Sequence, residues 1–138
     1  MKKKVLVIDG QGGMLGKQLV SEVRKLIPEA EITAVGTNSA ATSVMLKAGA
    51  DRGATGENSV IVCSRSADII VGPVGIVIAD SLLGEITAEM AAAVGRSTAY
   101  KILLPVNKCN NIIIGAEGKT TSELIAEAID KIREISEI

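Results

Sequence analysis

The sequence has no histidine, tryptophan or phenylalanine, and Tyr100 is its one aromatic residue. Histidine is the commonest general base near neutral pH and the commonest ligand of transition metals, so its absence excludes Ser–His and Cys–His nucleophile pairs. Any chemistry must therefore depend on Asp, Glu, Lys, Cys or Tyr side chains, or on a bound metal or cofactor. A chain with one aromatic ring also lacks a platform on which nucleic-acid bases stack. We expect Tyr100 to pack at the beginning of a strand.

Excess positive charge and cysteine patterns are also absent. The chain has 15 basic and 16 acidic residues, a net charge of −1, so nothing favours contacts with a phosphate backbone and we predict no nucleic-acid partner. Cys63 and Cys109 form neither a disulfide framework nor a metal-binding spacing. We expect reduced thiols in a cytosolic protein, and we assign no metal ligands.

Long hydrophobic runs are missing as well. After the N-terminal lysines, four apolar residues end at Asp9-Gly10, which is too short for a signal peptide. The apolar stretch over residues 69–83 contains Gly72, Pro73 and Asp80 and is too short to span a membrane. We therefore predict a cytoplasmic location and no membrane partner. With 47% hydrophobic residues, the 138-residue chain can build a core, and we predict one domain over residues 1–138.

Strand-like and helical patterns alternate along the chain. Short apolar runs rich in valine and isoleucine predict buried parallel strands over residues 4–8, 31–35, 68–71, 100–104 and 112–114. Helical spacing and end signals predict helices over 15–27, 39–48, 76–83, after Thr87 and after Thr120. Residues 59–65 suit a helix or a strand, and we favour a short helix; residues 51–58 suggest a loop. This alternation predicts an α/β fold, a three-layer Rossmann-like domain with a mostly parallel sheet of about five strands.

A glycine-rich segment lies between the first strand and the first helix, where free helix N–H groups can hold a phosphate. The segment consists of Gly10, Gln11, Gly12, Gly13, Met14, Leu15 and Gly16. The Rossmann fingerprint Gly-x-Gly-x-x-Gly is matched at Gly10 and Gly12, and its third glycine comes one residue late, at Gly16. The second strand ends without the acidic residue that holds the ribose of NAD, and without an arginine for the phosphate of NADP. Small polar groups there, Thr37, Asn38 and Ser39, can bind either cofactor weakly.

Two other interpretations of the segment stay open. A P-loop would use Gly16-Lys17, but Gln11 then replaces its first glycine and Gln18 replaces its magnesium-binding hydroxyl, so ATP is less favoured than NAD(P). The segment can also be a tight turn with no ligand. Asp9 bears on all of these, because a carboxylate repels phosphate unless it binds the loop backbone or helps to hold a metal.

The loops that follow parallel strands meet at one edge of a sheet. Here those loops are 10–16, 36–39, 72–75 and 105–109, so we add Gly72, Pro73 and Gly75 to the predicted site. Other residues are weaker candidates. We favour an unreactive loop thiol at Cys109, an anion-binding or solvated role for Arg52, and capping or surface roles for Asp80 and Glu85.

Six short motifs follow one another along the chain. They are Val-Ile-Asp-Gly-Gln-Gly-Gly at 7–13, Gly-Thr-Asn with Ala-Thr-Ser at 36–43, Gly-Ala-Thr-Gly-Glu-Asn at 53–58, Gly-Pro-Val-Gly at 72–75, Gly-Glu-Ile-Thr at 84–87 and Asn-Lys-Cys-Asn at 107–110. Together they resemble a family of short bacterial proteins, common in anaerobes, that is catalogued only as a domain of unknown function. The resemblance implies a bacterial, cytosolic protein and assigns no catalytic residue.

These observations predict a small protein that binds a nucleotide, NAD(P)-like first and ATP second. A non-catalytic sensor or assembly factor is favoured, because histidine and a separate substrate domain are absent; the alternative is a small oxidoreductase or other enzyme that uses a bound dinucleotide. We also predict a homodimer. A helix over 76–83 would be apolar on most of its circumference and would need a second chain, unless a neighbouring helix covers it.

Overall fold

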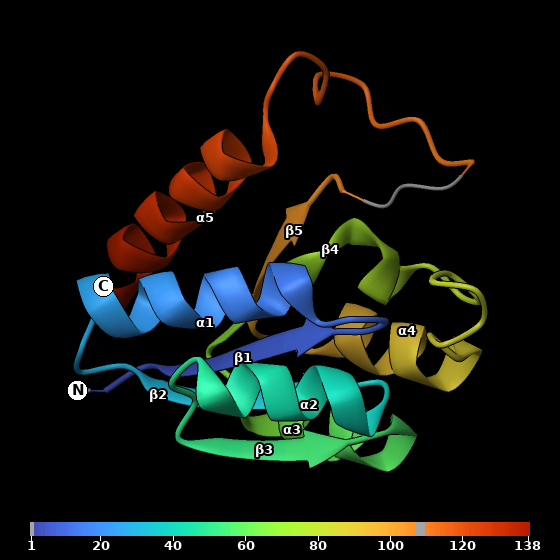
Figure 1. Cartoon of the computed structure of the whole chain (residues 1–138), viewed down its shortest axis with the longest axis horizontal. Coiled ribbons are helices and arrows are strands. Elements are labelled where there is room, and N and C mark those ends of the chain that lie inside the picture. Colours follow the sequence, from blue (N-terminus) through green and yellow to red (C-terminus); the bar gives the residue numbers. More distant parts are fainter. Residues whose placement is uncertain (1, 107–109) are drawn as a thin grey trace.

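Five parallel strands form one sheet in the computed structural model, which describes residues 2–106 and 110–138 (Figure 1). The strands are β1 (Lys4–Asp9), β2 (Glu31–Gly36), β3 (Arg52–Thr55), β4 (Ile69–Pro73) and β5 (Tyr100–Leu104). Their order across the sheet is β3-β2-β1-β4-β5, and each neighbouring pair is parallel. This is the strand order of a Rossmann-type sheet. The predicted α/β class and the Rossmann-like architecture are confirmed.

Among the described residues, five α-helices cover the two faces of this sheet. They are α1 (Met14–Leu26), α2 (Ser39–Lys47), α3 (Glu57–Ser66), α4 (Ala88–Arg96) and α5 (Thr121–Ser136). Helices α1, α2 and α5 pack on one face, and α3 and α4 pack on the other. Parallel strands need crossover connections, which contain α1 to α4, whereas α5 follows the last strand.

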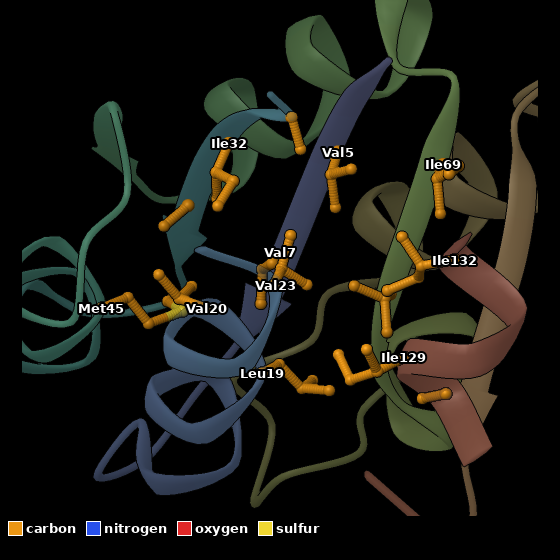
Figure 2. Close-up of a cluster of buried hydrophobic side chains, with 14 of the residues drawn as sticks. Val5, Val7, Leu19, Val20, Val23, Ile32, Met45, Ile69, Ile129 and Ile132 are labelled. Carbon is orange, nitrogen blue, oxygen red and sulfur yellow. The ribbon is translucent and has the colours of Figure 1, made fainter. Parts of the chain in front are cut away.

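Strand β1 lies at the centre of the sheet and is buried on both faces. Val5 and Val7 belong to the core beneath α1 and α5, whereas Leu6 and Ile8 belong to the core beneath α3 and α4. Figure 2 shows Val5 and Val7 in the first of these cores, with Val5 between Ile32 and Ile69 of the neighbouring strands and Val7 next to Val23 of α1. Burial on both faces explains why the strand is a continuous apolar run without alternation.

Several local signals have the predicted effect. Helix α1 ends at Leu26, just before Pro28. Thr87 caps α4 by accepting a hydrogen bond from the N–H of Met90, and Thr120 forms a capping box with Glu123 at the start of α5. The ambiguous segment over 59–65 lies within α3. None of the described helices has the length and apolar composition needed to cross a bilayer.

Two strand assignments were wrong. Residues 52–55, predicted to be part of a loop, form β3. This strand pairs with β2, with Arg52 opposite Thr33 and Thr55 opposite Gly36. Of its residues, Arg-Gly-Ala-Thr, only Ala54 packs against the core, so the backbone pairing with β2 is the main contact of this edge strand. Residues 112–114, predicted to be a strand, lie outside the described strands, and Ile112 and Ile114 are 79% and 89% exposed.

The helix predicted over 76–83 was also wrong. The chain forms a short 3₁₀ helix, η1 (Val74–Val77), followed by turns in which Asp80, Leu82 and Leu83 have left-handed φ values of 65°, 56° and 56°. An apolar residue at nearly every position has no period, so composition could not exclude a helix.

The apolar residues of this segment are largely covered by the chain itself. Ile76 and Leu82 are buried in the core that contains α4. The large apolar side chain of this segment that is exposed is Leu83, at 93%. The neighbouring helix therefore provides the cover that the predicted second chain was to supply. The homodimer stays a prediction without that argument, and sedimentation at micromolar concentration tests it.

Candidate functional site

The glycine-rich loop lies at the carboxyl edge of the sheet, where β1 passes into α1. The chain continues from β1 to β2 on one side, and β4 flanks β1 on the other side. Strand order therefore reverses next to this loop, and ligands of open α/β sheets bind at such a switch point. The loops after β2 and β4 lie at the same edge, because all the strands are parallel.

Two glycines of the loop are required by the fold. Gly13 precedes α1 with a left-handed φ of 73°. A Cβ at Gly16 would lie 2.9 Å from the Cβ of Asp9 and would overlap the sulfur of Met45. Close packing of helix on strand is the role of the third glycine in the Rossmann fingerprint, so Gly16 has that role although it comes one residue late.

Gly12 differs from its neighbours because its surroundings are open. A Cβ there would have one near neighbour, the Cγ of Met14 at 3.9 Å, and the residue is exposed. By contrast, a Cβ at Gly10 would lie 2.8 Å from Oε1 of Glu85 and 3.0 Å from Cδ1 of Leu82. A ligand can therefore approach the loop backbone at Gly12, whereas the space over Gly10 is filled by the chain.

Asp9 is buried beneath the loop, 4% exposed, and binds the backbone on both sides of it. Its Oδ1 accepts a hydrogen bond from the N–H of Gly10 at 2.8 Å, and its Oδ2 accepts one from the N–H of Gly16 at 2.7 Å. Burial raises the pKa of Asp9, although these hydrogen bonds act in the opposite direction. Of the two conditions under which Asp9 tolerates a nearby phosphate, the structure meets the first, because the carboxylate binds the loop.

Glu85, from the turns after η1, lies against the outer side of the loop. Its Oε1 accepts hydrogen bonds from the N–H of Gln11 at 2.7 Å, the hydroxyl of Thr37 at 2.5 Å and the side-chain amide of Asn38 at 3.1 Å. The Gln11 hydrogen bond, followed by that of Thr37, lowers the pKa of Glu85. We call the three donors, Gln11 N–H, Thr37 and Asn38, the anion cradle.

Asn38 ties the cradle together. Its Nδ2 also donates to the carbonyl of Gln11 at 2.9 Å, and its Oδ1 accepts from the N–H of Ala41 at the start of α2. The N–H of Thr37 donates to the carbonyl of Asp9 at 3.0 Å. The loops after β1 and β2 are therefore held in one arrangement.

The other predicted site residues have structural or peripheral positions. Gly72 and Pro73 are buried at the end of β4, and a Cβ at Gly72 would overlap the carbonyl oxygen of Ile8. A Cβ at Gly75 would lie 2.8 Å from Oγ of Ser81, so this glycine allows the next turn to pack. Leu15 is buried in the core, while Met14 and Ser39 are exposed at the first positions of α1 and α2.

Several weaker candidates lie away from the cradle. Arg52 pairs with Glu31 at 2.7 Å at the amino end of β3, which is the opposite edge of the sheet. Lys17 lines a groove between α1 and α5. Tyr100 does begin β5 but is 57% exposed, so the expectation that it packs was wrong. Cys109 lies outside the described residues.

A second feature of the same edge is an apolar groove of about 400 Å³. Val74, just after β4, and Leu103 of β5 form one side, and Ile113 and Leu124 contribute from the connection to α5 and from α5 itself. Within residues 2–106 and 110–138, no group of three or more Asp, Glu or Cys side chains is placed to hold a metal ion.

Glu85 is the site residue that sequence reasoning missed, since it was assigned to a capping or surface role. Its contact with Gln11 spans 74 residues, and the Gly-Glu-Ile-Thr motif at 84–87, which contains Glu85, assigned it no role. The sequence around a carboxylate that follows a turn is the same whether the turn packs against the glycine-rich loop or faces solvent, so it could not predict this contact.

Comparison with known proteins gives a family but no activity. No curated protein matches the chain. Among solved structures, the chain is similar to a dodecameric FMN-dependent Ubix-like decarboxylase from Escherichia coli O157:H7, with 15% identity over 99% of this chain and 95% of that one and a TM-score of 0.46. A likeness this distant carries no argument about function. The profile of the family described as "Domain of unknown function (DUF3842)" matches residues 4–137, so the chain belongs to that family.

Proposed function

We propose that this chain is a cytosolic nucleotide-binding protein that holds a phosphate at the carboxyl edge of the sheet, beside Gly12. One observation carries the proposal. At the switch point, the N–H of Gln11 and the side chains of Thr37 and Asn38 converge on one carboxylate oxygen, so the site has donors arranged for an anion. The open backbone at Gly12 adjoins these donors and leaves room for a ligand.

A dinucleotide such as NAD(P) suits the site better than ATP in a P-loop. The strand order and the packing role of Gly16 are those of the dinucleotide-binding fold. The apolar groove beside Val74 and Leu103 offers a surface for a flat ring at the same edge. Lys17, the lysine that a P-loop would need, lines the groove next to α5.

A sensor or assembly factor is the class of protein that we favour. Both carboxylates at the site are already hydrogen-bonded, Asp9 to two backbone N–H groups and Glu85 to three donors. The lowered pKa of Glu85 makes it a poor general base, and Asp9, although its pKa is raised by burial, lies beneath the loop with both oxygens bound to the loop backbone. The apolar groove supports a small oxidoreductase as the second candidate, because a nicotinamide ring would find an apolar wall there at Val74 and Leu103.

Titration calorimetry with NAD⁺, NADP⁺, ATP and FMN tests the proposal. The Gly12→Val variant should lose at least about tenfold in affinity, because a branched side chain enters the phosphate path. Its unfolding midpoint should stay close to that of the wild type, since the position is open. Gly95→Val is the matched control, because Gly95 also has open surroundings but lies in α4.

Two results would count against the proposal. If the wild-type chain binds none of the four nucleotides, the proposed function is wrong. If Gly12→Val binds as tightly as the wild type, the chain binds nucleotides at another place.

A further inference from the structure

The segment from Asp80 to Ile86, which we call the strap, is folded into a closed unit. The N–H of Asp80 donates to the carbonyl of Ile86 at 2.7 Å, and the N–H of Gly84 donates to the carbonyl of Asp80 at 3.1 Å. Leu82 and Ile86 are buried in the core beneath α4, so the strap is anchored there and the turn that carries Glu85 is its exposed part. Its contacts with the glycine-rich loop are made by Glu85 and Leu82.

The strap holds an unfavourable backbone. Asp80, Leu82 and Leu83 are not glycine, yet all three have left-handed φ values of 65°, 56° and 56°. Such residues persist where the surrounding contacts over-determine them, and they cluster in parts of proteins that switch. Leu83 is 93% exposed, so its own side chain does not supply the contacts that hold this conformation.

We propose that the strap is an internal competitor for the nucleotide: Glu85 occupies the anion cradle in the free protein, and it must leave before a nucleotide phosphate can bind there. This inference rests on the proposed function. It gives the favoured sensor role a physical form, because ligand binding would displace Glu85 and loosen the exposed turn that carries it.

The chemistry of the cradle supports displacement. A carboxylate and a phosphate accept hydrogen bonds from the same N–H and O–H donors, so they compete directly for Gln11, Thr37 and Asn38. Asp9 already places one carboxylate beneath the loop, and Glu85 adds a second nearby. A phosphate that entered with Glu85 in place would lie near two carboxylates, Asp9 and Glu85. A phosphate that replaces Glu85 would lie near Asp9 alone.

Substitutions within the strap should change nucleotide affinity in opposite directions. Glu85→Ala removes the competitor and should tighten binding by about three- to tenfold, as the binding-competent fraction rises. Leu83→Gly relieves the left-handed conformation of the closed strap and should weaken binding by about two- to fivefold. Glu89→Ala is the charge-matched control, because Glu89 is exposed on α4, and it should stay within about twofold of the wild type.

Glu85→Gln covers the case in which the alanine variant does not fold. Its amide oxygen can still accept the Gln11 hydrogen bond, but it no longer competes as an anion, so binding should again tighten. Hydrogen exchange gives a readout that affinity alone does not. The amides of Gly84 and Glu85 should exchange faster when NAD⁺ or ATP is bound to the wild type, since the contact of Glu85 with the cradle then no longer holds this turn.

The possible outcomes separate the two proposals. Equal nucleotide affinity in the wild type, Glu85→Ala and Glu85→Gln, with strap exchange unchanged by ligand, would overturn the strap and leave the proposed function intact. Failure of the wild type and of both Glu85 variants to bind any nucleotide or inorganic pyrophosphate would overturn both. Tighter binding by the Glu85 variants, weaker binding by Leu83→Gly and faster strap exchange would support the strap.

Discussion

Gln11 and Glu85 are joined by a 2.7 Å hydrogen bond, in which the backbone N–H of Gln11 donates to Oε1 of a glutamate 74 residues further along the chain. Gln11 adopts a left-handed φ of 49° in the loop after β1, and Glu85 follows the turns after β4. The bond therefore joins the two connections that flank the switch point of the sheet. The stability of this edge should depend on the charge of Glu85.

The first prediction concerns pH. The hydrogen bond from Gln11 holds the pKa of Glu85 below its ordinary value of 4.5. A carboxyl with a lowered pKa contributes stability that is present above its unfolded pKa and is lost as the pH falls through the folded pKa. The wild type should therefore exceed Glu85→Gln in stability at about pH 6, and the difference should shrink towards about pH 3. Urea denaturation at each pH measures it.

Asp9 contributes to the pH dependence in the opposite direction. Burial raises its pKa above the ordinary value of 3.8, so its ionisation costs stability as the pH rises through that range. The charge of Glu85 also raises the pKa of Asp9, so the comparison measures the contribution of Glu85 together with its effect on Asp9. A stability difference that stayed constant across the range would show that the charge of Glu85 does not contribute.

The second prediction concerns Asp9. Asparagine offers one acceptor oxygen where the carboxylate uses two, so Asp9→Asn leaves the N–H of Gly10 or Gly16 facing an amide NH₂. We expect the free energy of unfolding to fall by about 1–3 kcal/mol. Denaturant titration at neutral pH measures this.

Asp130→Asn is the control for Asp9. Asp130 is exposed on α5, so the free energy of unfolding of Asp130→Asn should stay within about 0.5 kcal/mol of that of the wild type. An unchanged or increased stability of Asp9→Asn would mean that the cost of burying the charge exceeds the gain from its two hydrogen bonds.

The third prediction compares two helical glycines. In α1, Gly16→Ala places a Cβ against Met45 and Asp9, and overpacking should lower the free energy of unfolding by about 1–3 kcal/mol. In α4, Gly95→Ala places a Cβ in open space, and the better helix propensity of alanine should raise it by about 0.5–1 kcal/mol. Thermal unfolding of the pair shows whether the signs differ; two changes of the same sign would refute the packing role of Gly16.

The fourth prediction concerns Lys17. Because this lysine is exposed and lines the groove next to α5, Lys17→Ala should reduce the affinity for ATP or NAD⁺ by no more than about fivefold. Calorimetry with both nucleotides provides the measurement. A loss in ATP affinity of more than about a hundredfold, with NAD⁺ unaffected, would favour the P-loop interpretation instead.

The sequence alone predicted the features that depend on a few neighbouring residues. The apolar runs gave four of the strands, and the cap residues Thr87 and Thr120 marked helix starts, because capping and burial patterns act over one or two turns. The glycine-rich loop was predicted for the same reason, since its place between a strand and a helix is local.

The tertiary structure decided the features that depend on a distant partner. Residues 52–55 are a strand because β2 offers a free edge, and residues 112–114 are not, although they are more apolar. Ile76 and Leu82 are buried because α4 packs over them. Above all, the acceptor that the N–H of Gln11 meets depends on where a turn 74 residues away comes to lie. Any carboxylate satisfies a backbone N–H equally well, so only the packing of the whole chain selects Glu85.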